Sequence, residues 1–379
     1  MKKIAIVANS CWYVYNFRRE LLRAILYSKY QITIIAPYDN YTKLLEEMGF
    51  SVCLWDLKRS SINPINELSS ILNLVYYLNR EKPDLVHNFT IKSCLYGMIA
   101  SRLCKVKNII NSITGLGHLF LSNSIKMRII RILMRPLYIY LFNLRGCYTI
   151  FQNIHDQRFL KKFAILRNIN NSFLIEGSGV DIDLFHPKKN NHFKLSEPLK
   201  LLFPSRIIRE KGFEELLIAY ASLLKKDENI ELYIAGEIDE GNRSSLVLED
   251  KKNLSLNKKI KFLGHSSNME KVYSECDIVI LPSWREGLSR SLIEAGAMGK
   301  AIITTDVPGC RDVVDHGING ILIPVKDPKA IESAVLFIIK NKNIAKIYGK
   351  NIRKKVEKKF DVKIINRKTI NIYNQILDS

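Results

Sequence analysis

Two glutamates separated by seven residues, Glu286 and Glu294, follow a short apolar segment that ends at Leu281. The apolar segment is typical of a buried strand, so Glu286 falls in the next loop and Glu294 about two helical turns further on. Gly287 lets a ligand approach the backbone closely, and amides at a helix start favour a phosphate. Carboxylates are also common there because they cap the helix and complement its dipole. The spacing alone leaves a ligand site and a structural role equally open.

Two cations follow another expected strand, Leu199–Pro204. Arg206 comes directly after this strand, and Lys211 opens the next helix. A nucleoside diphosphate carries strong acceptor oxygens, and an arginine and a lysine can neutralise its charge as it departs. Ordinary surface charge is the alternative for this pair.

The second half of the chain resembles the retaining glycosyltransferases of family 4, which have the GT-B fold. Glu286 and Glu294 match the family's E-x7-E motif, and Ser205–Gly212 looks like its R-x4-K-G element. The other matching segments, in the family's order, are FLGH at 262–265, DVPGC at 306–310 and NGIL at 319–322. Several ordered motifs make a chance similarity improbable.

This resemblance implies a donor site for a nucleotide diphosphate sugar and transfer with retention of the anomeric configuration. In the family the second glutamate, here Glu294, bonds the ribose hydroxyls, and the first, here Glu286, contacts the donor sugar. The expected donor-binding residues are Arg206, Lys211, Gly264, His265, Glu286, Gly287, Leu288, Ser289 and Glu294. The expected catalytic residues are Glu286, His118, Arg206 and Lys211.

The first half resembles bacterial transferases that extend lipid-linked oligosaccharides, including N-acetylgalactosaminyltransferases that act on undecaprenyl diphosphate. The matching segments are YNFR at 15–18, RSSINP at 59–64, KS at 92–93 and TGLGH at 114–118. The expected acceptor residues are Asn16, Arg18, Lys92, Gly115, Gly117 and His118. His118 follows a Gly-x-Gly loop, where imidazole could bond a sugar hydroxyl or a transferring proton; a structural role is equally open.

Short apolar strands that alternate with longer amphipathic segments must position these residues, a pattern typical of parallel sheets covered by helices. The expected strands of the first half are Ile4–Ala8, Gln31–Ala36, Val52–Asp56, Leu85–His87, Asn108–Ser112, Thr149–Gln152 and Ser172–Glu176. Those of the second half are Leu199–Pro204, Ile230–Ala235, Ile260–Leu263, Ile278–Leu281, Ala301–Thr304 and Gly320–Ile323.

The polar segment 177–195, rich in Gly, Pro and Asn, interrupts this alternation and predicts a domain boundary near residue 190. We therefore expect an α/β chain of the GT-B type, with two doubly wound, Rossmann-like domains facing a central cleft. Residues 1–190 would bind the acceptor, and residues 191–361 would bind the nucleotide sugar. The GT-B resemblance implies that a closing helix, 362–379, packs back on the first domain.

Asp181 and Asp183 form a D-x-D triplet that could hold a divalent cation on a diphosphate. The triplet lies in GVDIDLFHP, 179–187, which looks like the segment that joins the two domains of GT-B enzymes. Because Arg206 and Lys211 can supply the positive charge, we expect no metal and no cofactor.

The chain of 379 residues has 58 Lys and Arg against 37 Asp and Glu, a formal charge of +21, and most of the excess lies before residue 190. This charge attracts nucleic acid, anionic lipid or a nucleotide-linked substrate. Residues 124–145 mix apolar side chains with Lys126, Arg128, Arg131 and Arg135. This composition indicates a helix at an anionic lipid surface, with a core helix bearing solvated arginines as the alternative.

The longest apolar stretch is interrupted by Arg131, Arg135 and Pro136, whereas a membrane-spanning helix needs about 20 apolar residues. The apolar run at the start is shorter than that of a signal peptide, and the scattered cysteines are typical of a reducing compartment. These features predict a cytoplasmic protein associated peripherally with the inner membrane face.

Together, these features predict a retaining, metal-independent glycosyltransferase of surface polysaccharide synthesis. It would move a hexose or N-acetylhexosamine from UDP to a lipid-linked saccharide. A nucleotide-sugar 2-epimerase of similar fold is one alternative. A basic nucleic-acid-binding protein is another, although the sequence lacks an RRM, KH or zinc-knuckle signature.

Overall fold

A computed structural model of the chain describes residues 1–28, 30–58, 63–115, 125–187, 195–226, 229–238, 245, 254 and 257–378. These residues form two compact units. Unit 1 comprises residues 1–178 and the segment from Val362 onward, and unit 2 comprises residues 179–361. The boundary falls inside the predicted segment 177–195, but before residue 190. It lies earlier because Val180 and Phe185 are buried in the core of unit 2, and Val180 pairs with Asp361.

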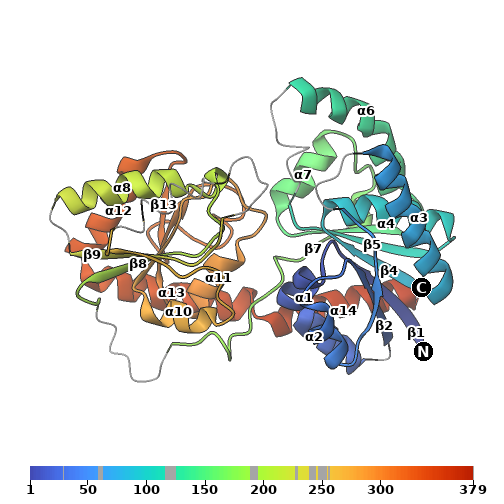
Figure 1. Cartoon of the computed structure of the whole chain (residues 1–379), viewed down its shortest axis with the longest axis horizontal. Coiled ribbons are helices and arrows are strands. Elements are labelled where there is room, and N and C mark those ends of the chain that lie inside the picture. Colours follow the sequence, from blue (N-terminus) through green and yellow to red (C-terminus); the bar gives the residue numbers. More distant parts are fainter. Residues whose placement is uncertain are drawn as a thin grey trace. The chain divides into compact units, whose positions relative to one another are not determined.

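The described part of unit 1 contains a seven-stranded parallel sheet in the order β3-β2-β1-β4-β5-β6-β7 (Figure 1). Its strands are β1 (Lys2–Val7), β2 (Tyr30–Ala36), β3 (Ser51–Leu54), β4 (Leu85–Phe89), β5 (Asn108–Ile113), β6 (Cys147–Phe151) and β7 (Ser172–Leu174). One face of the sheet is covered by α1 (Cys11–Leu26), α2 (Thr42–Glu47) and α14 (Val362–Leu377). The other face carries α3 (Pro64–Glu81), α4 (Ile91–Leu103), α6 (Ile125–Phe142) and α7 (Ile154–Lys162), and η1 (Ile169–Asn171) precedes β7.

The described part of unit 2 contains a six-stranded parallel sheet in the order β10-β9-β8-β11-β12-β13. Its strands are β8 (Leu199–Phe203), β9 (Ile230–Ile234), β10 (Ile260–Phe262), β11 (Ile278–Leu281), β12 (Ala301–Thr305) and β13 (Ile321–Ile323). Helices α8 (Phe213–Lys225) and α12 (Pro328–Lys340) cover one face (Figure 1). The opposite face carries α10 (Met269–Glu275), α11 (Arg290–Ala297) and α13 (Lys342–Lys359), and the short helix η2 (Arg209–Lys211) leads into α8.

Each expected strand is present, with ends that differ by at most two residues. The prediction of two Rossmann-like α/β sheets is therefore confirmed. Several helices begin where the sequence supplies an N-cap oxygen, because the first amides of a helix lack partners within the helix. Ser10, Asn63 and Asp327 accept such amide hydrogen bonds, and proline follows Asn63 and Asp327 at the first helical position.

The tail helix α14 belongs to the core of unit 1. Ile365, Tyr373 and Ile376 are buried together with residues of β1, β2 and α1. Tyr30 donates a 2.6 Å hydrogen bond to Asn374 Oδ1 and thereby joins β2 to this helix. No helix in the described parts of the chain is long and apolar enough to cross a membrane.

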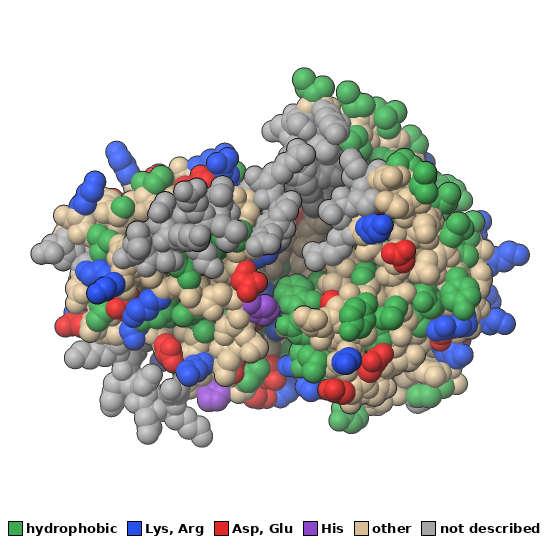
Figure 2. All heavy atoms as spheres, viewed as in Figure 1, with side chains coloured by type: hydrophobic (Ala, Val, Ile, Leu, Met, Phe, Trp, Pro, Cys, Tyr) green, Lys and Arg blue, Asp and Glu red, His purple; other side chains and the backbone are tan. Residues whose placement is uncertain are grey.

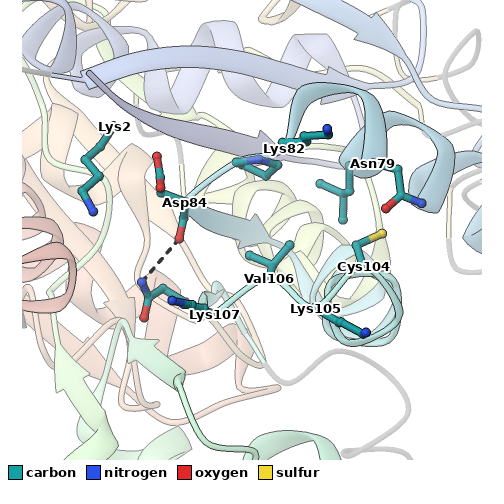
Figure 3. Close-up of a pocket in the computed structure, with 11 residues that line it drawn as sticks. Lys2, Asn79, Lys82, Asp84, Cys104, Lys105, Val106 and Lys107 are labelled. Atoms are coloured by element: carbon teal, nitrogen blue, oxygen red, sulfur yellow. Dashed lines mark hydrogen bonds between the residues drawn. The ribbon is translucent and has the colours of Figure 1, made fainter.

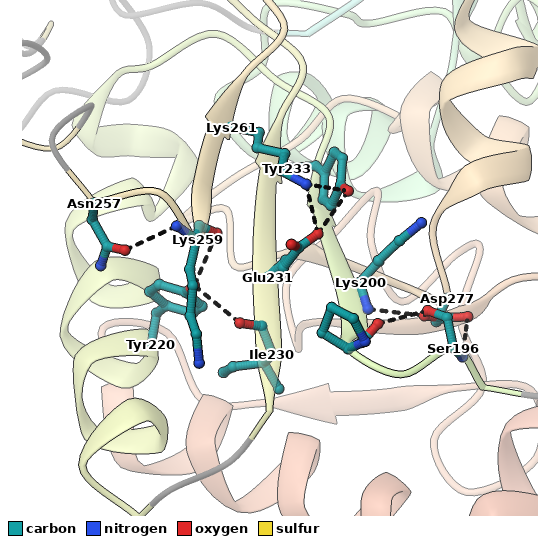
Figure 4. A network of polar contacts seen from close by, with 11 residues as sticks. Ser196, Lys200, Tyr220, Ile230, Glu231, Tyr233, Asn257, Lys259, Lys261 and Asp277 are labelled. Atoms are coloured by element: carbon teal, nitrogen blue, oxygen red, sulfur yellow. Dashed lines mark hydrogen bonds and ion pairs between the residues drawn. The ribbon is translucent and has the colours of Figure 1, made fainter.

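Polar side chains tie the strands of unit 2 together away from the carboxyl ends of the strands (Figure 4). Lys261 on β10 donates to Glu231 on β9 at 2.8 Å and lies 3.0 Å from the Tyr233 hydroxyl. The hydrogen bond from Lys261 lowers the pKa of the Glu231 carboxyl. Asp277, before β11, accepts a 2.8 Å hydrogen bond from the backbone amide of Lys200 on β8. These contacts add side-chain links between neighbouring strands of the sheet that carries the site.

Candidate active site

The expected donor-site residues of unit 2 gather around β8 and β11, which are neighbours at the centre of the sheet. The chain leaves β8 toward one edge of the sheet and β11 toward the other, so their carboxyl ends form a topological switch point. Ligands of doubly wound sheets bind in the crevice at such a point. Arg206 and Lys211 follow β8, and Glu286 follows β11. Residues far apart in the sequence are thereby brought to one edge.

The centre of this site is an ion pair between Lys211 and Glu286, whose Nζ and Oε1 atoms are 2.5 Å apart. Ser283 donates a 2.8 Å hydrogen bond to the same carboxylate oxygen. The two charged side chains are only 19% and 11% exposed, so water screens their interaction less than it screens a surface pair. The loop after β11 is therefore held against η2 by a partly buried, charge-assisted hydrogen bond.

Trp284 anchors the same loop from its other side. Its backbone amide donates to the carbonyl of Glu210 at 2.9 Å, and its indole Nε1 donates to Glu215 Oε1 at 3.0 Å. The Nζ atom of Lys326 lies 4.1 Å from the centre of the indole ring. Sequence analysis missed Ser283 and Trp284 as supporting residues. Their position just before Glu286 was the one signal in the sequence, because the side-chain partner of Trp284 is remote and the bond from Ser283 to Glu286 depends on the path of the loop.

Two glycines are required by close backbone approaches at this edge. Gly212 has a φ of +72°, and a Cβ atom there would lie 2.1 Å from the carbonyl oxygen of Pro282. Gly309 has a φ of +80°, and its Cβ would lie 2.7 Å from the carbonyl oxygens of Glu286 and Gly287. Glycine alone avoids both the left-handed strain and the clash. The lysine loop and the glutamate loop can therefore pack tightly together.

Glu294 lies on α11 and is 9% exposed. Its Oε1 atom accepts from Arg290 Nε at 2.8 Å, and its Oε2 atom lies 3.2 Å from the hydroxyl of Tyr273. Burial, with the nearby Glu294 carboxylate as a smaller cause, raises the pKa of Tyr273 well above its usual value. The tyrosine therefore stays protonated and can donate. Such a held carboxylate presents fixed acceptor positions, which suits recognition of paired hydroxyl groups.

The remaining expected donor residues surround this centre unevenly. Ser289 is the buried N-cap of α11, while Leu288 packs partly buried against the core of unit 2. Arg206 is exposed. Gly264, with a φ of +65°, and the exposed His265 follow β10, two strands away from β8 in the sheet. The structure thus brings Lys211 and Glu286 into contact and places Gly264 and His265 further along the same edge.

The expected acceptor residues of unit 1 have contrasting surroundings. Arg18 on α1 is 6% exposed; its Nε and Nη2 atoms donate to the Tyr13 hydroxyl at 3.2 and 2.9 Å. The guanidinium carbon lies 4.4 Å from the centre of the Phe89 ring, and no carboxylate of the described residues pairs with it. Arg18 also contributes, after burial, to the lowered pKa of His87. A buried guanidinium without a carboxylate is suited to an anionic ligand.

Lys92, on α4, is already paired. Its Nζ atom lies 2.9 Å from Glu67 Oε2 and donates to the carbonyl of Lys58 at 2.9 Å. Asn16 donates a 2.9 Å hydrogen bond to the carbonyl of Trp12, one turn earlier on α1. Gly115, with a φ of +147°, follows β5. The expected residues Gly117 and His118 lie outside the described residues, as does most of the segment 59–64.

The D-x-D triplet shapes a local turn. Asp181 Oδ1 accepts from the backbone amides of Asp183 and Leu184 at 2.9 and 3.2 Å. Within the described residues, no three His, Cys, Asp or Glu side chains are grouped so that they could hold a metal ion.

The predicted lipid-facing helix α6 has an apolar outer side. The exposed large side chains on it, 53 to 78% exposed, are Ile125, Ile129, Ile132, Leu133 and Tyr140. Arg128 and Arg135 are exposed beside them, and Arg131 is half-buried. The side chain of Lys126 lies outside the described residues. Tyr138, Leu141 and Phe142 on the inner side are buried in unit 1. An exposed helix normally turns polar side chains outward, so the outer side of α6 is more apolar than that of an ordinary surface helix.

Comparison with known proteins assigns the family. Residues 186–355 match the family "Glycosyl transferases group 1", and residues 3–153 match the family "Glycosyl transferase 4-like". The chain is a glycosyltransferase. This assignment agrees with the family that the sequence motifs resemble and with the GT-B fold. It also favours a transferase over the alternative of a nucleotide-sugar 2-epimerase.

The enzyme resembles several transferases along most of its length. It is 25% identical over 386 residues to N,N'-diacetylbacillosaminyl-diphospho-undecaprenol alpha-1,3-N-acetylgalactosaminyltransferase of Campylobacter jejuni, and 99% of each chain is covered. It is 24% identical over 313 residues to UDP-Gal:alpha-D-GlcNAc-diphosphoundecaprenol alpha-1,3-galactosyltransferase of Escherichia coli, with 80% of this chain and 78% of that one covered. Anabaena HepE in complex with UDP superimposes with a TM-score of 0.78 at 18% identity, over 99% of this chain and 100% of HepE.

Proposed function

We propose that this glycosyltransferase moves a hexose or N-acetylhexosamine from UDP to a saccharide linked to undecaprenyl diphosphate, with retention of the anomeric configuration and without a metal. The observation that carries the donor half of this proposal is the pair formed by Lys211 and Glu286 at the switch point of unit 2. The acceptor half is supported by the two bacterial relatives whose names specify acceptors of that kind.

In the proposed reaction, the bond between the anomeric carbon and the diphosphate oxygen breaks. The oxygen of an acceptor hydroxyl bonds to the anomeric carbon on the same face, and the hydroxyl proton leaves with the departing UDP. Arg206 and Lys211 neutralise the charge that grows on the departing diphosphate. In the free enzyme the Lys211 ammonium binds the Glu286 carboxylate. When the donor binds, Lys211 would give up part of this contact and bind a phosphate oxygen. Glu286 would then be released to a hydroxyl of the donor sugar. Its Ser283 hydrogen bond keeps the carboxylate oriented during this exchange.

Glu294 is proposed to accept hydrogen bonds from both ribose hydroxyls. Arg290 and Tyr273 hold one carboxylate oxygen each, which fixes the plane of the group before the nucleotide arrives. An acceptor whose orientation is already set loses little conformational freedom on binding. We propose that no metal is needed, because Arg206 and Lys211 could supply the positive charge that the diphosphate requires.

In unit 1, Asn16, Arg18, Lys92, Gly115, Gly117 and His118 are proposed to serve the acceptor. Arg18 has the surroundings best suited to an anionic group, because its buried guanidinium lacks a carboxylate among the described residues. Lys92 would have to share its charge with Glu67.

Helix α6 is proposed to lie in the interface of the inner membrane face, where the acceptor's lipid is anchored. Its exposed isoleucines and leucine would enter the headgroup region, and Lys126, Arg128, Arg131 and Arg135 would face anionic lipid. With this contact, the enzyme would be a cytoplasmic protein bound peripherally to the membrane.

A transfer assay with a panel of UDP and GDP sugars tests the proposal. Purified enzyme would be incubated with each donor and a synthetic undecaprenyl-diphosphate-linked saccharide, and the lipid product would be analysed by mass spectrometry. We expect a mass increase of one hexose or N-acetylhexosamine with a UDP donor, undiminished by EDTA. A product formed only with GDP sugars, or only after metal addition, would refute the donor or the metal assignment.

A further inference from the structure

A pocket of about 420 Å³ lies in unit 1 at the amino ends of its strands, away from the carboxyl ends that carry the acceptor residues (Figure 3). It is bounded by the ends of α3 and α4 and by the starts of β1 and β5. Four lysines line it, namely Lys2, Lys82, Lys105 and Lys107, against a single carboxylate, Asp84. No function assigned above uses this pocket.

The lysines of the pocket have free charges, while its carboxylate is engaged. Asp84 accepts a 2.8 Å hydrogen bond from the backbone amide of Lys3. The four ammonium groups make no hydrogen bond or ion pair with any described residue, and all four side chains are exposed. Lys82 and Lys105 follow helix C-termini, where a cation complements the dipole. Lys2 and Lys107 stand at strand starts, so the dipole does not account for them.

An apolar stripe runs along α3 toward this pocket. Its four large side chains recur at helical spacing and are 55 to 78% exposed: Ile65, Leu68, Leu72 and Tyr76. The exposed Leu103 at the end of α4 adds to the apolar surface beside the pocket. Figure 2 shows hydrophobic side chains along the side of unit 1 that carries α3 and α6. Because α4 packs against both α3 and α6, the three helices form one layer of unit 1.

We propose that the α3 stripe and the lysine pocket dock on an anionic phospholipid bilayer, with a lipid phosphate seated among Lys82, Lys105 and Lys107. Apolar side chains bordered by unpaired lysines match the interface of such a bilayer in both polarity and charge. A second copy of this chain fits less well, since its net charge of +21 would oppose these lysines. The inference rests on the proposed function only insofar as a lipid-linked acceptor brings the enzyme to a membrane.

Sedimentation with vesicles tests the pocket. The variant Lys82→Gln/Lys105→Gln/Lys107→Gln would be compared with Lys346→Gln/Lys350→Gln/Lys354→Gln, which removes the same charge from exposed positions of α13. Each lysine near an anionic surface contributes about a fivefold gain in binding. We expect the pocket variant, which lacks three lysines, to bind vesicles containing phosphatidylglycerol about a hundred times more weakly than wild type. The α13 variant should bind nearly as well as wild type. Equal behaviour of the two variants would overturn the proposal.

Two further arms separate the alternatives. Leu68→Gln/Leu72→Gln should weaken binding to phosphatidylglycerol vesicles and to pure phosphatidylcholine vesicles alike, whereas Ile218→Gln/Ile347→Gln, on exposed positions of unit 2, should not. Millimolar inorganic phosphate should leave vesicle binding largely intact; full release by phosphate would make the pocket a free-phosphate site instead. Transfer to a water-soluble acceptor analogue, measured on the same preparations, should stay at the wild-type level. If the wild-type enzyme itself showed no transfer to this analogue, the proposed function would be refuted, and the vesicle result would still stand.

Discussion

Replacing each glutamate of the E-x7-E motif by glutamine should separate nucleotide binding from sugar transfer. Glu294→Gln keeps the size and one oxygen acceptor, but it loses the second acceptor and the negative charge. Arg290 Nε is 2.8 Å from Glu294 Oε1 and Tyr273 is 3.2 Å from Oε2, so the amide nitrogen must face one of these donors or the ribose. Whichever of these partners the amide nitrogen faces, one hydrogen bond to a charged carboxylate is lost. The loss is costly because Glu294 is only 9% exposed.

A buried hydrogen bond to a charged group is worth about 1–3 kcal/mol, so Glu294→Gln should weaken UDP binding by roughly 5- to 150-fold. Glu286→Gln should change UDP affinity little, because its carboxylate is proposed to contact the sugar, which free UDP lacks. Its turnover should nevertheless fall sharply. Isothermal titration with UDP and initial rates with the UDP sugar measure the two effects separately.

Glu215→Gln is the matched control for this pair. Glu215 is also a poorly exposed carboxylate of unit 2, and it accepts from the Trp284 indole rather than facing the proposed ligand. Glutamine can still accept that hydrogen bond, so UDP affinity should remain close to the wild-type value. If Glu286→Gln weakened UDP binding more than Glu294→Gln did, the two proposed roles would be reversed. Equal weakening by all three variants would mean that the loop is merely destabilised.

Three further predictions concern the neighbouring cations, the metal and the stability of unit 2. Lys211→Ala or Arg206→Ala should lower kcat/KM, with a loss of transition-state stabilisation of about 2–4 kcal/mol, the scale of one charge contact. Near-normal turnover with an intact thermal transition would exclude that role. Activity should persist in excess EDTA, and a loss restored only by a divalent metal would contradict the assignment of the charge to side chains. Arg353→Ala should destabilise unit 2 by about 2–3 kcal/mol, because Arg353 Nη1 donates to the carbonyls of Phe185 and Ala297 at 2.6 Å; an unchanged unfolding midpoint in urea would show that water replaces these bonds.

The strands, and the meeting of Lys211 with Glu286, could be predicted from the sequence because both depend on local patterns. Apolar runs bounded by polar loops identify buried parallel strands, and loops that follow such strands converge at one edge. Lys211 and Glu286, 75 positions apart, could therefore be assigned to one site before their contact was known. Which side chains of a loop face the neighbouring loop depends on tertiary packing. The sequence therefore did not indicate the supporting roles of Ser283 and Trp284.

The domain boundary and the state of Lys92 depend on contacts that leave no local signal. The prediction located the boundary in the polar segment 177–195 but set it at residue 190, whereas the burial of Val180 and Phe185 assigns the residues from 179 onward to unit 2. Lys92 was expected to be available to an acceptor, and its pairing with Glu67 joins α4 to α3. The exposed stripe of α3 was also missed, because its spacing equals that of a helix buried in a core.

The most direct test of the central claim is the anomeric configuration of the linkage formed from a UDP sugar on an undecaprenyl-diphosphate-linked saccharide. Nuclear magnetic resonance of the released glycan measures it, with the Lys211→Ala enzyme as the control for the proposed donor site. We predict an α-linked sugar from an α-configured donor and little product with Lys211→Ala. A β-linked product, or undiminished synthesis by Lys211→Ala, would contradict retaining transfer at the Lys211 and Glu286 site.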